Sequence, residues 1–345
     1  MALAGPPGLP LNETAMPLPN RVEREGPTTM SYLSGRALDA AGITDPQLRQ
    51  DYDVARELHS EHGRTYYLST MLLPPEKRPY VWALYGFARR ADEFVDSLSD
   101  PDPQALLAWG ASFLDGLYRP DAARNGGEPQ TDPVSRAMVH TMRTWNMPRA
   151  HVEAFLESMQ LDITVIGYPT YSDLEQYMYG SAAVIGLLML PILEPQAPEA
   201  AARARALGEA FQLTNFIRDV GEDLGRGRVY LPQEDLDDFG VTRELLAAGV
   251  VTPPIRELLK FEIERARALY AFAEPGIAML HPTSRPCMYT AASLYSGILD
   301  EVEQAGYQVL RQRLAVPMRR RITVAVPAWR QARAARRVER TWQVA

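Results

Sequence analysis

The sequence predicts an all-α fold, because helical periodicity runs through most of the chain and strand patterns are almost absent. Apolar residues recur at helical spacing in long segments, and prolines and glycines fall at the joints between these segments. The only candidate strand is the short run RITVAV at residues 321–326. A chain of 345 residues, 46 % of them apolar, can bury a large core. We therefore expect a bundle of helices.

One domain is expected at residues 45–315, because no long polar linker interrupts them. The leader before it, residues 1–30, contains six prolines and no aromatic residue, so it is predicted to be disordered. It also lacks the pattern of a secretory signal, and the single cysteine, Cys287, is typical of a reducing compartment. These features predict a cytoplasmic protein. Residues 316–345 are expected to form a basic C-terminal tail.

The helix predicted at residues 80–96 carries charged side chains along one stripe. At 100° per residue, Tyr85, Arg89, Asp92 and Asp96 face the same way, and apolar residues cover most of the remaining circumference. A buried acidic stripe needs a counter-charge. Mg²⁺ takes oxygen ligands and often bridges carboxylates to phosphates, so it is a suitable partner. For one such pattern alone, a solvated acidic face is the alternative.

A second segment, residues 211–232, repeats this arrangement. Asn215, Asp219 and Asp223 recur at steps of four along one face, while most other sides are apolar. Two such helices could face each other. Opposed acidic faces would then hold metal ions that grip a diphosphate.

Glycines indicate two further features of the second acidic helix. Gly221 lies inside it, where glycine costs about 1 kcal/mol relative to alanine, so a ligand or a neighbouring helix should approach closely there. Gly225 and Gly227 end the helix and begin a segment that contains arginines. That segment is either a flap that closes over phosphates or an ordinary helix C-terminus with solvated arginines.

Both acidic segments resemble motifs of a known family. RRADEFVD at residues 89–96 and QLTNFIRDVGEDLGRGRVYLP at residues 212–232 are similar to the two aspartate-rich motifs of the squalene and phytoene synthases, head-to-head prenyltransferases of the class I isoprenoid fold. Further similar stretches are HGRTYYLSTMLLPPEKR (62–78), YMYGSAAVIG (177–186), LYSGILDEVEQAGY (294–307) and LDAAGITDPQLR (38–49), the last of which looks most like bacterial phytoene synthases. The resemblance implies a single-domain helical bundle with a central cavity.

The resemblance also implies roles for individual residues. The implied catalytic residues are Asp92, Asp96, Asp219, Asp223, Tyr85 and Tyr295. The implied ligands of Mg²⁺, or of Mn²⁺, are Asp92, Asp96, Asn215, Asp219 and Asp223. The implied substrate-binding residues are Arg64, Thr65, Arg89, Tyr177, Gly186, Gln212, Asn215, Arg218, Arg228 and Arg313, with Arg311 as the alternative to Arg313.

Two other positions of the similar stretches carry an expectation. Gly63 stands where the family usually has a serine that contacts diphosphate, so this contact should be missing. The small residues between Gly180 and Gly186 either permit close helix packing or form the thin wall of an isoprenoid pocket.

The implied activity is that of a phytoene synthase. Two geranylgeranyl diphosphates would condense head to head, through prephytoene diphosphate, to phytoene in carotenoid biosynthesis, without NADPH. The alternatives are squalene, presqualene or hydroxysqualene synthesis from farnesyl diphosphate, and a terpene cyclase of the same fold. A scaffold homologue without activity is disfavoured, because both acidic stripes are intact.

The C-terminal part of the chain is strongly basic. Residues 311–340 contain ten arginines and one acid, Glu339, which is a net charge of +9, and the rest of the chain carries −16 to give the total of −7. This asymmetry predicts attraction to anionic lipid headgroups, hence a peripheral position at the inner face of the membrane. Nucleic acid is disfavoured because no nucleic-acid motif accompanies the arginines. A solvated helix is the remaining alternative.

Overall fold

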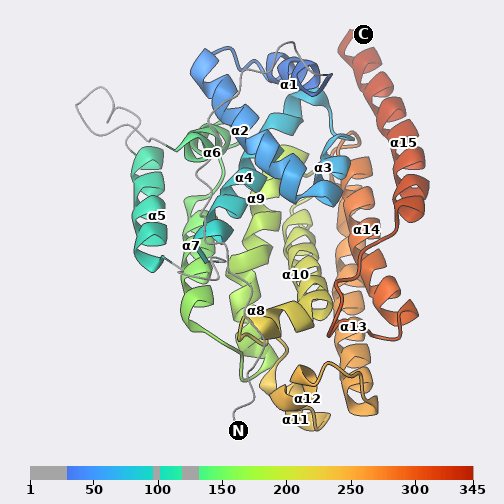
Figure 1. Cartoon of the computed structure of the whole chain (residues 1–345). Helices are drawn as coiled ribbons and strands as arrows, with labels where there is room; N and C mark the ends of the chain where they lie inside the picture. Colours follow the sequence, from blue (N-terminus) through green and yellow to red (C-terminus); the bar gives the residue numbers. More distant parts are fainter. Residues whose placement is uncertain (1–28, 96–101, 119–131, 345) are drawn as a thin grey trace, which may run out of the picture.

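The computed structural model describes residues 29–95, 102–118 and 132–344 of the chain, and these residues are almost entirely helical (Figure 1). The elements are α1 (Thr29–Ala40), α2 (Pro46–His62), α3 (Arg64–Thr70), η1 (Pro75–Lys77), α4 (Arg78–Val95), α5 (Pro103–Tyr118), α6 (Pro133–Thr144), α7 (Arg149–Thr164), α8 (Tyr171–Met178), η2 (Tyr179–Ala183), α9 (Val184–Leu193), α10 (Ala200–Gly225), α11 (Gln233–Asp238), α12 (Arg243–Ala247), α13 (Pro253–Ala273), η3 (Glu274–Met279), α14 (Arg285–Gln304) and α15 (Met318–Val344).

The described residues contain no β-strand, only two isolated bridges between backbone segments, Gly167 with Val229 and Pro195 with Leu280. The prediction of an all-α bundle is therefore confirmed. The candidate strand at residues 321–326 was wrong, because it lies inside α15. A strand needs a pairing partner, and none is present among the residues described. Residues 1–28 of the predicted disordered leader lie outside the part of the chain that the structure describes.

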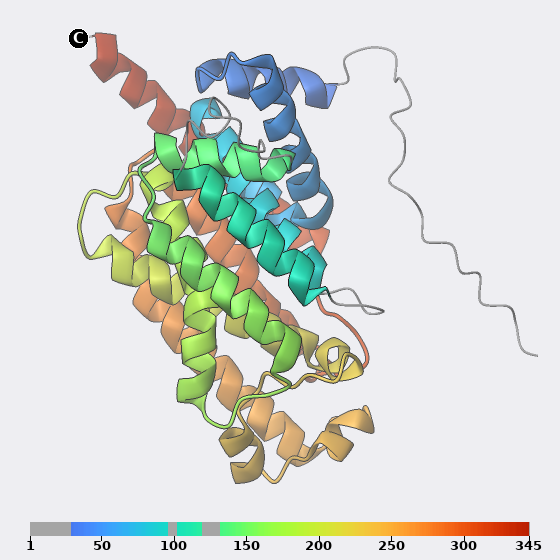
Figure 2. The ribbon, with the colours of Figure 1, turned by 90° about the vertical axis from the view of Figure 1, so that its left-hand side faces the viewer.

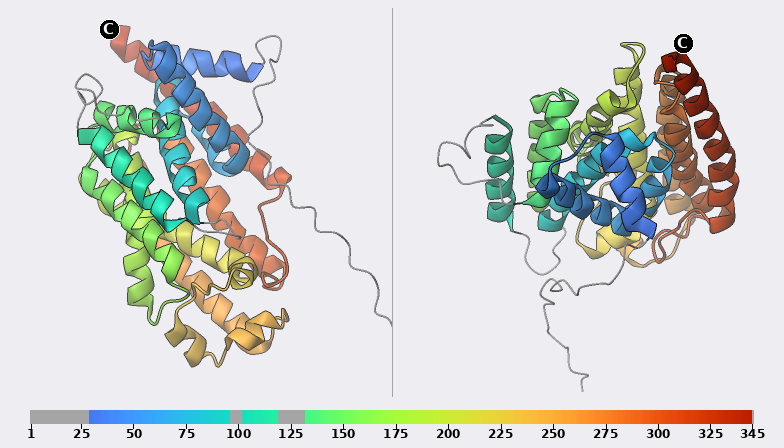
Figure 3. Two further views of the ribbon diagram at one scale, coloured as in Figure 1. Left: turned by 60° about the vertical axis from the view of Figure 1, so that its left-hand side comes forward. Right: turned by 90° about the horizontal axis from the view of Figure 1, so that it is seen from above.

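Two helices organise the bundle. α10 runs through its middle and packs against α9, α13 and α14, while α4 packs against α2, α6 and α7 (Figures 1 and 2). Seen from above, α5 lies at one edge and α15 at the opposite edge, against α14 (Figure 3). The two central helices are those that carry the acidic stripes.

Each central helix is surrounded by its own set of buried side chains. Around α4, the ring of Phe87 lies 4.6 Å from that of Phe113 and 5.6 Å from that of Phe155. Around α10, Leu213 and Ile217 are fully buried in a second cluster, which α13 and α14 complete. Burying one such side chain stabilises the fold by about 1.5–3 kcal/mol, so both helices are held firmly in the core.

A long helical stretch from Tyr171 to Leu193 packs beside both central helices. By length and composition it could cross a membrane, but 56 % of its most apolar window is buried inside the bundle, where it packs against α7 and α10. Its glycines allow this packing. A Cβ atom on Gly180 would lie 2.6 Å from the Ala154 carbonyl oxygen, and one on Gly186 would lie 2.5 Å from that of Ala204. Close helix packing, one of the two expectations for these small residues, is therefore observed.

Gly221 is required by a close backbone approach, as expected, although the neighbour is neither a ligand nor a helix. It is the extended segment after α14, and a Cβ atom on Gly221 would lie 2.2 Å from the Leu310 carbonyl oxygen. We expect Gly221→Ala to lower the free energy of unfolding by about 1–3 kcal/mol, because backbone atoms must move apart. Denaturant unfolding measures this loss.

Gly225→Ala is the matched control for that substitution. Gly225 lies on the same helix, and a Cβ atom there would meet nothing within 4 Å. This variant should be neutral or slightly more stable, because alanine restricts the unfolded chain. Equal losses in the two variants would show that the close approach at Gly221 is not what requires glycine.

Candidate active site

A cavity of about 900 Å³ lies between the two central helices. Its walls include parts of α2, α3, α4, α7, α8, α9, α10 and α14, residues 313–316 and the first turn of α15. Along α10 the lining is apolar from Ala200 to Phe211 apart from Arg203, whose guanidinium group turns away to the Phe272 carbonyl oxygen. From Gln212 to Asp223 the lining is mostly polar. The cavity thus has an apolar arm and a polar end.

Every predicted site residue within the described part of the chain lines this one cavity. These residues are Arg64, Thr65, Tyr85, Arg89, Asp92, Tyr177, Gly186, Gln212, Asn215, Arg218, Asp219, Asp223, Arg228, Tyr295 and Arg313. Asp96 lies outside the described residues. The two acidic helices, far apart in sequence, therefore contribute to the same space, as their stripes predicted.

The acids of α10 differ in their electrostatic surroundings. Asp219 accepts hydrogen bonds from the guanidinium groups of Arg218 and Arg313, with Nε–Oδ1 distances of 2.7 and 3.0 Å. Burial, and then the negative charge of Asp219, raise the pKa of Asp223 to about 7. Asn215 donates its amide group to Gln212, but its buried Oδ1 atom has no hydrogen-bond partner. A buried oxygen without a partner and, two turns further along the helix, a carboxylate that resists ionisation are both costly.

This donor set fits a hard divalent cation. Amide and carboxylate oxygens are the ligands that Mg²⁺ prefers, and a cation would satisfy the Asn215 oxygen and favour the ionised form of Asp223. No three acidic, histidine or cysteine side chains of the described residues already converge on one point. Arginines hold Asp219 instead.

Two arginine assignments depend on tertiary packing. Arg313 lines the cavity and pairs with Asp219, whereas Arg311 donates to the Ala248 carbonyl oxygen and does not line the cavity. Arg228 lies in the segment after α10, which is tied down by backbone hydrogen bonds from Arg228 to Asp223 and from Val229 to Ile166. The helix ends with the usual glycine cap, Gly227 in the left-handed conformation, and Arg226, Arg228 and Tyr230 of the segment that follows line the cavity.

Aromatic rings surround the middle of the cavity. The Tyr295 ring stacks on Tyr66 at 4.6 Å and lies 4.7 Å from Phe211, and the Tyr85 ring stacks on His59 at 4.2 Å. Ring faces stabilise cations, so this group suits a positively charged intermediate. Burial lowers the pKa of His59 to about 3, which keeps the imidazole neutral beside that space.

There is a steric reason for the glycine at position 63, where the similar family usually has a serine. A Cβ atom there would lie 2.6 Å from the Tyr85 ring and 2.9 Å from the His59 ring. A serine at this position would displace Tyr85. The absence of a Cβ atom at Gly63 therefore lets the Tyr85 ring lie flat against His59.

Several cavity residues were missed by the sequence analysis. Asp162, buried on α7, accepts hydrogen bonds from the hydroxyl groups of Tyr177 at 2.6 Å and of Tyr230 at 3.1 Å. An aspartate at an inward position of an amphipathic helix was the available signal for it. Tyr66 lies within the motif HGRTYY, but nothing in that motif showed whether Tyr66 or its neighbour Tyr67 would line the cavity. His59 offered no signal, because no second ligand stands at a characteristic spacing.

Comparison with known proteins identifies relatives over most of the chain. Residues 59–320 match the family model described as squalene/phytoene synthase. The 15-cis-phytoene synthase of Synechocystis sp. is 36 % identical over 296 residues, which cover 82 % of this chain and 85 % of the relative. The phytoene synthase of Arthrospira platensis is 36 % identical over 288 residues, covering 79 % and 90 %.

Solved structures resemble the fold as well. A dehydrosqualene synthase in complex with a ligand superposes with a TM-score of 0.74 at 28 % identity, covering 83 % of this chain and 98 % of that one. A squalene synthase from Alicyclobacillus acidocaldarius superposes with a TM-score of 0.68 at 27 % identity, covering 78 % and 98 %.

Proposed function

Because the chain belongs to the squalene/phytoene synthase family, we propose that it joins two geranylgeranyl diphosphates head to head to form phytoene, a step of carotenoid biosynthesis. It is a prenyltransferase of the phytoene synthase type. The observation that carries the proposal is the cavity, which joins two acidic helices at its polar end to a long apolar arm.

The length of the cavity supports a twenty-carbon substrate. On α10, Ala200 at the far end of the apolar arm and Asn215, the first predicted metal ligand, both line the cavity and lie roughly 22 Å apart at about 1.5 Å per residue. A geranylgeranyl chain built from carbon–carbon bonds of about 1.5 Å extends for roughly 20 Å. A chain whose diphosphate lies beside Asn215 therefore has room to extend to the end of the arm.

We assign the diphosphates to the polar end. Mg²⁺ or Mn²⁺ would be held there by Asp92, Asn215, Asp219 and Asp223, with Asp96 as a further ligand. When bound, the cation would neutralise charge on the departing diphosphate. The guanidinium groups of Arg89, Arg218, Arg228 and Arg313, with Arg64 and Thr65 at the start of α3, would donate hydrogen bonds to the phosphate oxygens. Charge stabilisation of this kind usually contributes more to catalysis than any other effect.

The remaining chemistry is that of carbocations. Ionisation of one substrate gives an allylic cation, and the alkene of the other substrate attacks it to form a cyclopropyl diphosphate. A second ionisation, rearrangement and loss of a proton then give phytoene, and no reductant such as NADPH is needed. Tyr85 and Tyr295 would face the cations with their rings, and the apolar walls would exclude water.

Product analysis tests the proposal. Purified protein with Mg²⁺ and geranylgeranyl diphosphate should form phytoene, with or without NADPH. The two solved relatives named above are a dehydrosqualene and a squalene synthase, which makes synthesis from farnesyl diphosphate the second candidate. A thirty-carbon main product would assign that candidate, a cyclic product from one substrate molecule would assign a cyclase, and no diphosphate release would indicate a scaffold.

The product also bears on where the enzyme works. A forty-carbon hydrocarbon does not dissolve in water and has to be transferred to a bilayer. The single cysteine and the basic C-terminal residues support a cytoplasmic enzyme that is peripheral to the inner face of the membrane.

A further inference from the structure

We propose that the outer face of α15 is a docking surface for an anionic lipid bilayer. In the first half of this helix, four large apolar side chains are exposed to solvent: Met318 by 66 %, Ile322 by 54 %, Val326 by 44 % and Trp329 by 49 %. At 100° per residue they fall within about 80° of one another, so they form one continuous stripe. We call these four residues the outer stripe. A water-exposed stripe of this kind marks an interaction site.

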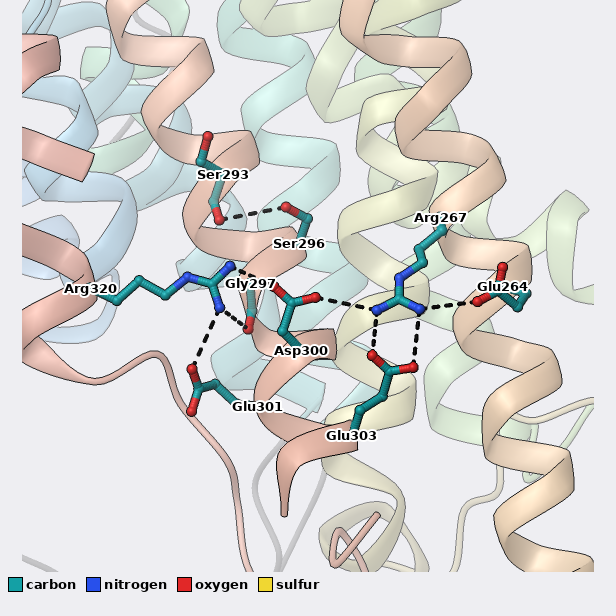
Figure 4. Close-up of polar contacts among 9 residues, drawn as sticks. All are labelled: Glu264, Arg267, Ser293, Ser296, Gly297, Asp300, Glu301, Glu303 and Arg320. Atoms are coloured by element: carbon teal, nitrogen blue, oxygen red, sulfur yellow. Dashed lines mark hydrogen bonds and ion pairs between the residues drawn. The ribbon is translucent and has the colours of Figure 1, made fainter. Parts of the chain in front are cut away.

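The outer stripe cannot turn inward, because other side chains of α15 fasten the helix to the bundle. Ala328 and Ala332 are buried against it. Arg320 binds Asp300, Glu301 and the Gly297 carbonyl oxygen of α14 (Figure 4). Near the other end of the helix, Arg336 donates to the Leu72 carbonyl oxygen at 3.0 Å.

The anchor extends beyond α14 to a third helix. Asp300 also pairs with Arg267 of α13, which in turn binds Glu264 and Glu303 (Figure 4). Two arginines and four acids thus connect three helices. The outer stripe is therefore presented on a rigid support.

The charge around the outer stripe favours an anionic surface. α15 contains eight arginines and one acid, Glu339, a net charge of +7, while the rest of the chain carries −14 to give −7. Arg319, Arg330 and Arg333 are exposed, and the Arg333 guanidinium group lies 4.8 Å from the centre of the Trp329 ring. An apolar stripe with a tryptophan and flanking arginines is the composition of helices that lie in the headgroup region of membranes.

A second copy of the chain is the weaker candidate for this surface. Stable protein interfaces bury about 800 Å² on each partner and are depleted of charge at their centre. The outer stripe is one helix wide and arginines flank it. Lipid headgroups match both features, because they accept a narrow apolar wedge and attract the surrounding positive charge.

The position of α15 connects this surface to the cavity. Val316, just before the helix, and Arg321, in its first turn, both line the cavity. A bilayer docked on the outer stripe would therefore lie beside the cavity wall, which shortens the path of an apolar product into lipid. This consequence rests on the proposed function, whereas the docking itself rests only on the surface of α15.

Vesicle co-sedimentation of the full-length protein, without substrate, tests the docking. Wild type should bind vesicles of phosphatidylcholine mixed with phosphatidylglycerol, bind phosphatidylcholine alone weakly, and lose binding as salt increases. Ile322→Asp combined with Trp329→Asp should weaken binding by about tenfold or more. Val338→Asp is the matched control, because Val338 is 57 % exposed on the opposite side of the same helix, and this variant should bind like wild type.

Two further measurements separate docking from misfolding and from self-association. Equal melting temperatures of the three proteins, and equal activity in detergent, would show that the stripe variants fold and that the proposed function stands independently. Equal binding of the double variant, or no binding of wild type to anionic vesicles, would overturn the proposal. A dimer of wild type that the double variant loses in sedimentation equilibrium would assign the surface to a second copy of the chain.

Discussion

Asp219→Ala combined with Asp223→Ala is expected to abolish turnover, with a fall in kcat/KM of at least about a thousandfold. Both carboxylates line the polar end of the cavity, and burial together with Asp219 raises the pKa of Asp223 to about 7. Two acids so close together favour the binding of a cation. Without them, no bound cation would balance the negative charge of the departing diphosphate. Diphosphate release from geranylgeranyl diphosphate measures the loss.

Metal-induced stabilisation gives a second readout for the same variant. A ligand that binds only the folded state raises its stability by about 2.7 kcal/mol at one hundred times its dissociation constant. Mg²⁺ with inorganic diphosphate should therefore raise the melting temperature of wild type and leave that of the double variant unchanged.

Asp237→Ala combined with Asp238→Ala controls for the change in net charge. Both aspartates are exposed and neither lines the cavity. This pair should retain wild-type turnover and the wild-type response to Mg²⁺. Undiminished turnover of the Asp219, Asp223 variant would contradict the placement of the diphosphates at the polar end.

Ala204→Phe is expected to shift substrate preference from geranylgeranyl to farnesyl diphosphate. Ala204 lines the apolar arm, and it lies about 16 Å along α10 from Asn215 at about 1.5 Å per residue. A phenyl ring there leaves room for a fifteen-carbon chain but collides with a twenty-carbon one. Overpacking costs about 1–3 kcal/mol, so kcat/KM for geranylgeranyl diphosphate should fall by roughly 10- to 100-fold. The value for farnesyl diphosphate should change much less.

Ala202→Phe is the matched control for chain length. Ala202 lies on the same turn of α10 but is exposed and does not line the cavity. This variant should keep the wild-type ratio of the two kcat/KM values. If Ala204→Phe also kept that ratio, the isoprenoid chain would not extend along the N-terminal half of α10.

Local spacing was sufficient to predict much of the site. Asn215, Asp219 and Asp223 share a face because α-helix geometry repeats every 3.6 residues, and this holds wherever the helix is placed. The same reasoning put Arg89 and Asp92 on one stripe. The two motifs then indicated the family, because each is long and specific in its sequence. These conclusions needed no knowledge of which helices meet.

Other conclusions depended on contacts between distant segments. Arg313 rather than Arg311 reaches Asp219 because of the path of the chain after α14. Asp162 became a site residue only when α7 met Tyr177 and the segment that contains Tyr230. Spacing along one helix carries no information about such pairs, since they are separated by many residues.

The sequence by itself determined the helical class, the two acidic stripes and the basic C-terminal residues, because each is a property of neighbouring positions. Only the tertiary structure decided what those features face. It turned the acidic stripes toward one cavity, placed Tyr85 against Gly63, and left the apolar side of α15 in solvent. The physical reason is that burial depends on which surfaces pack together across the whole chain, whereas periodicity depends only on the geometry of a single helix.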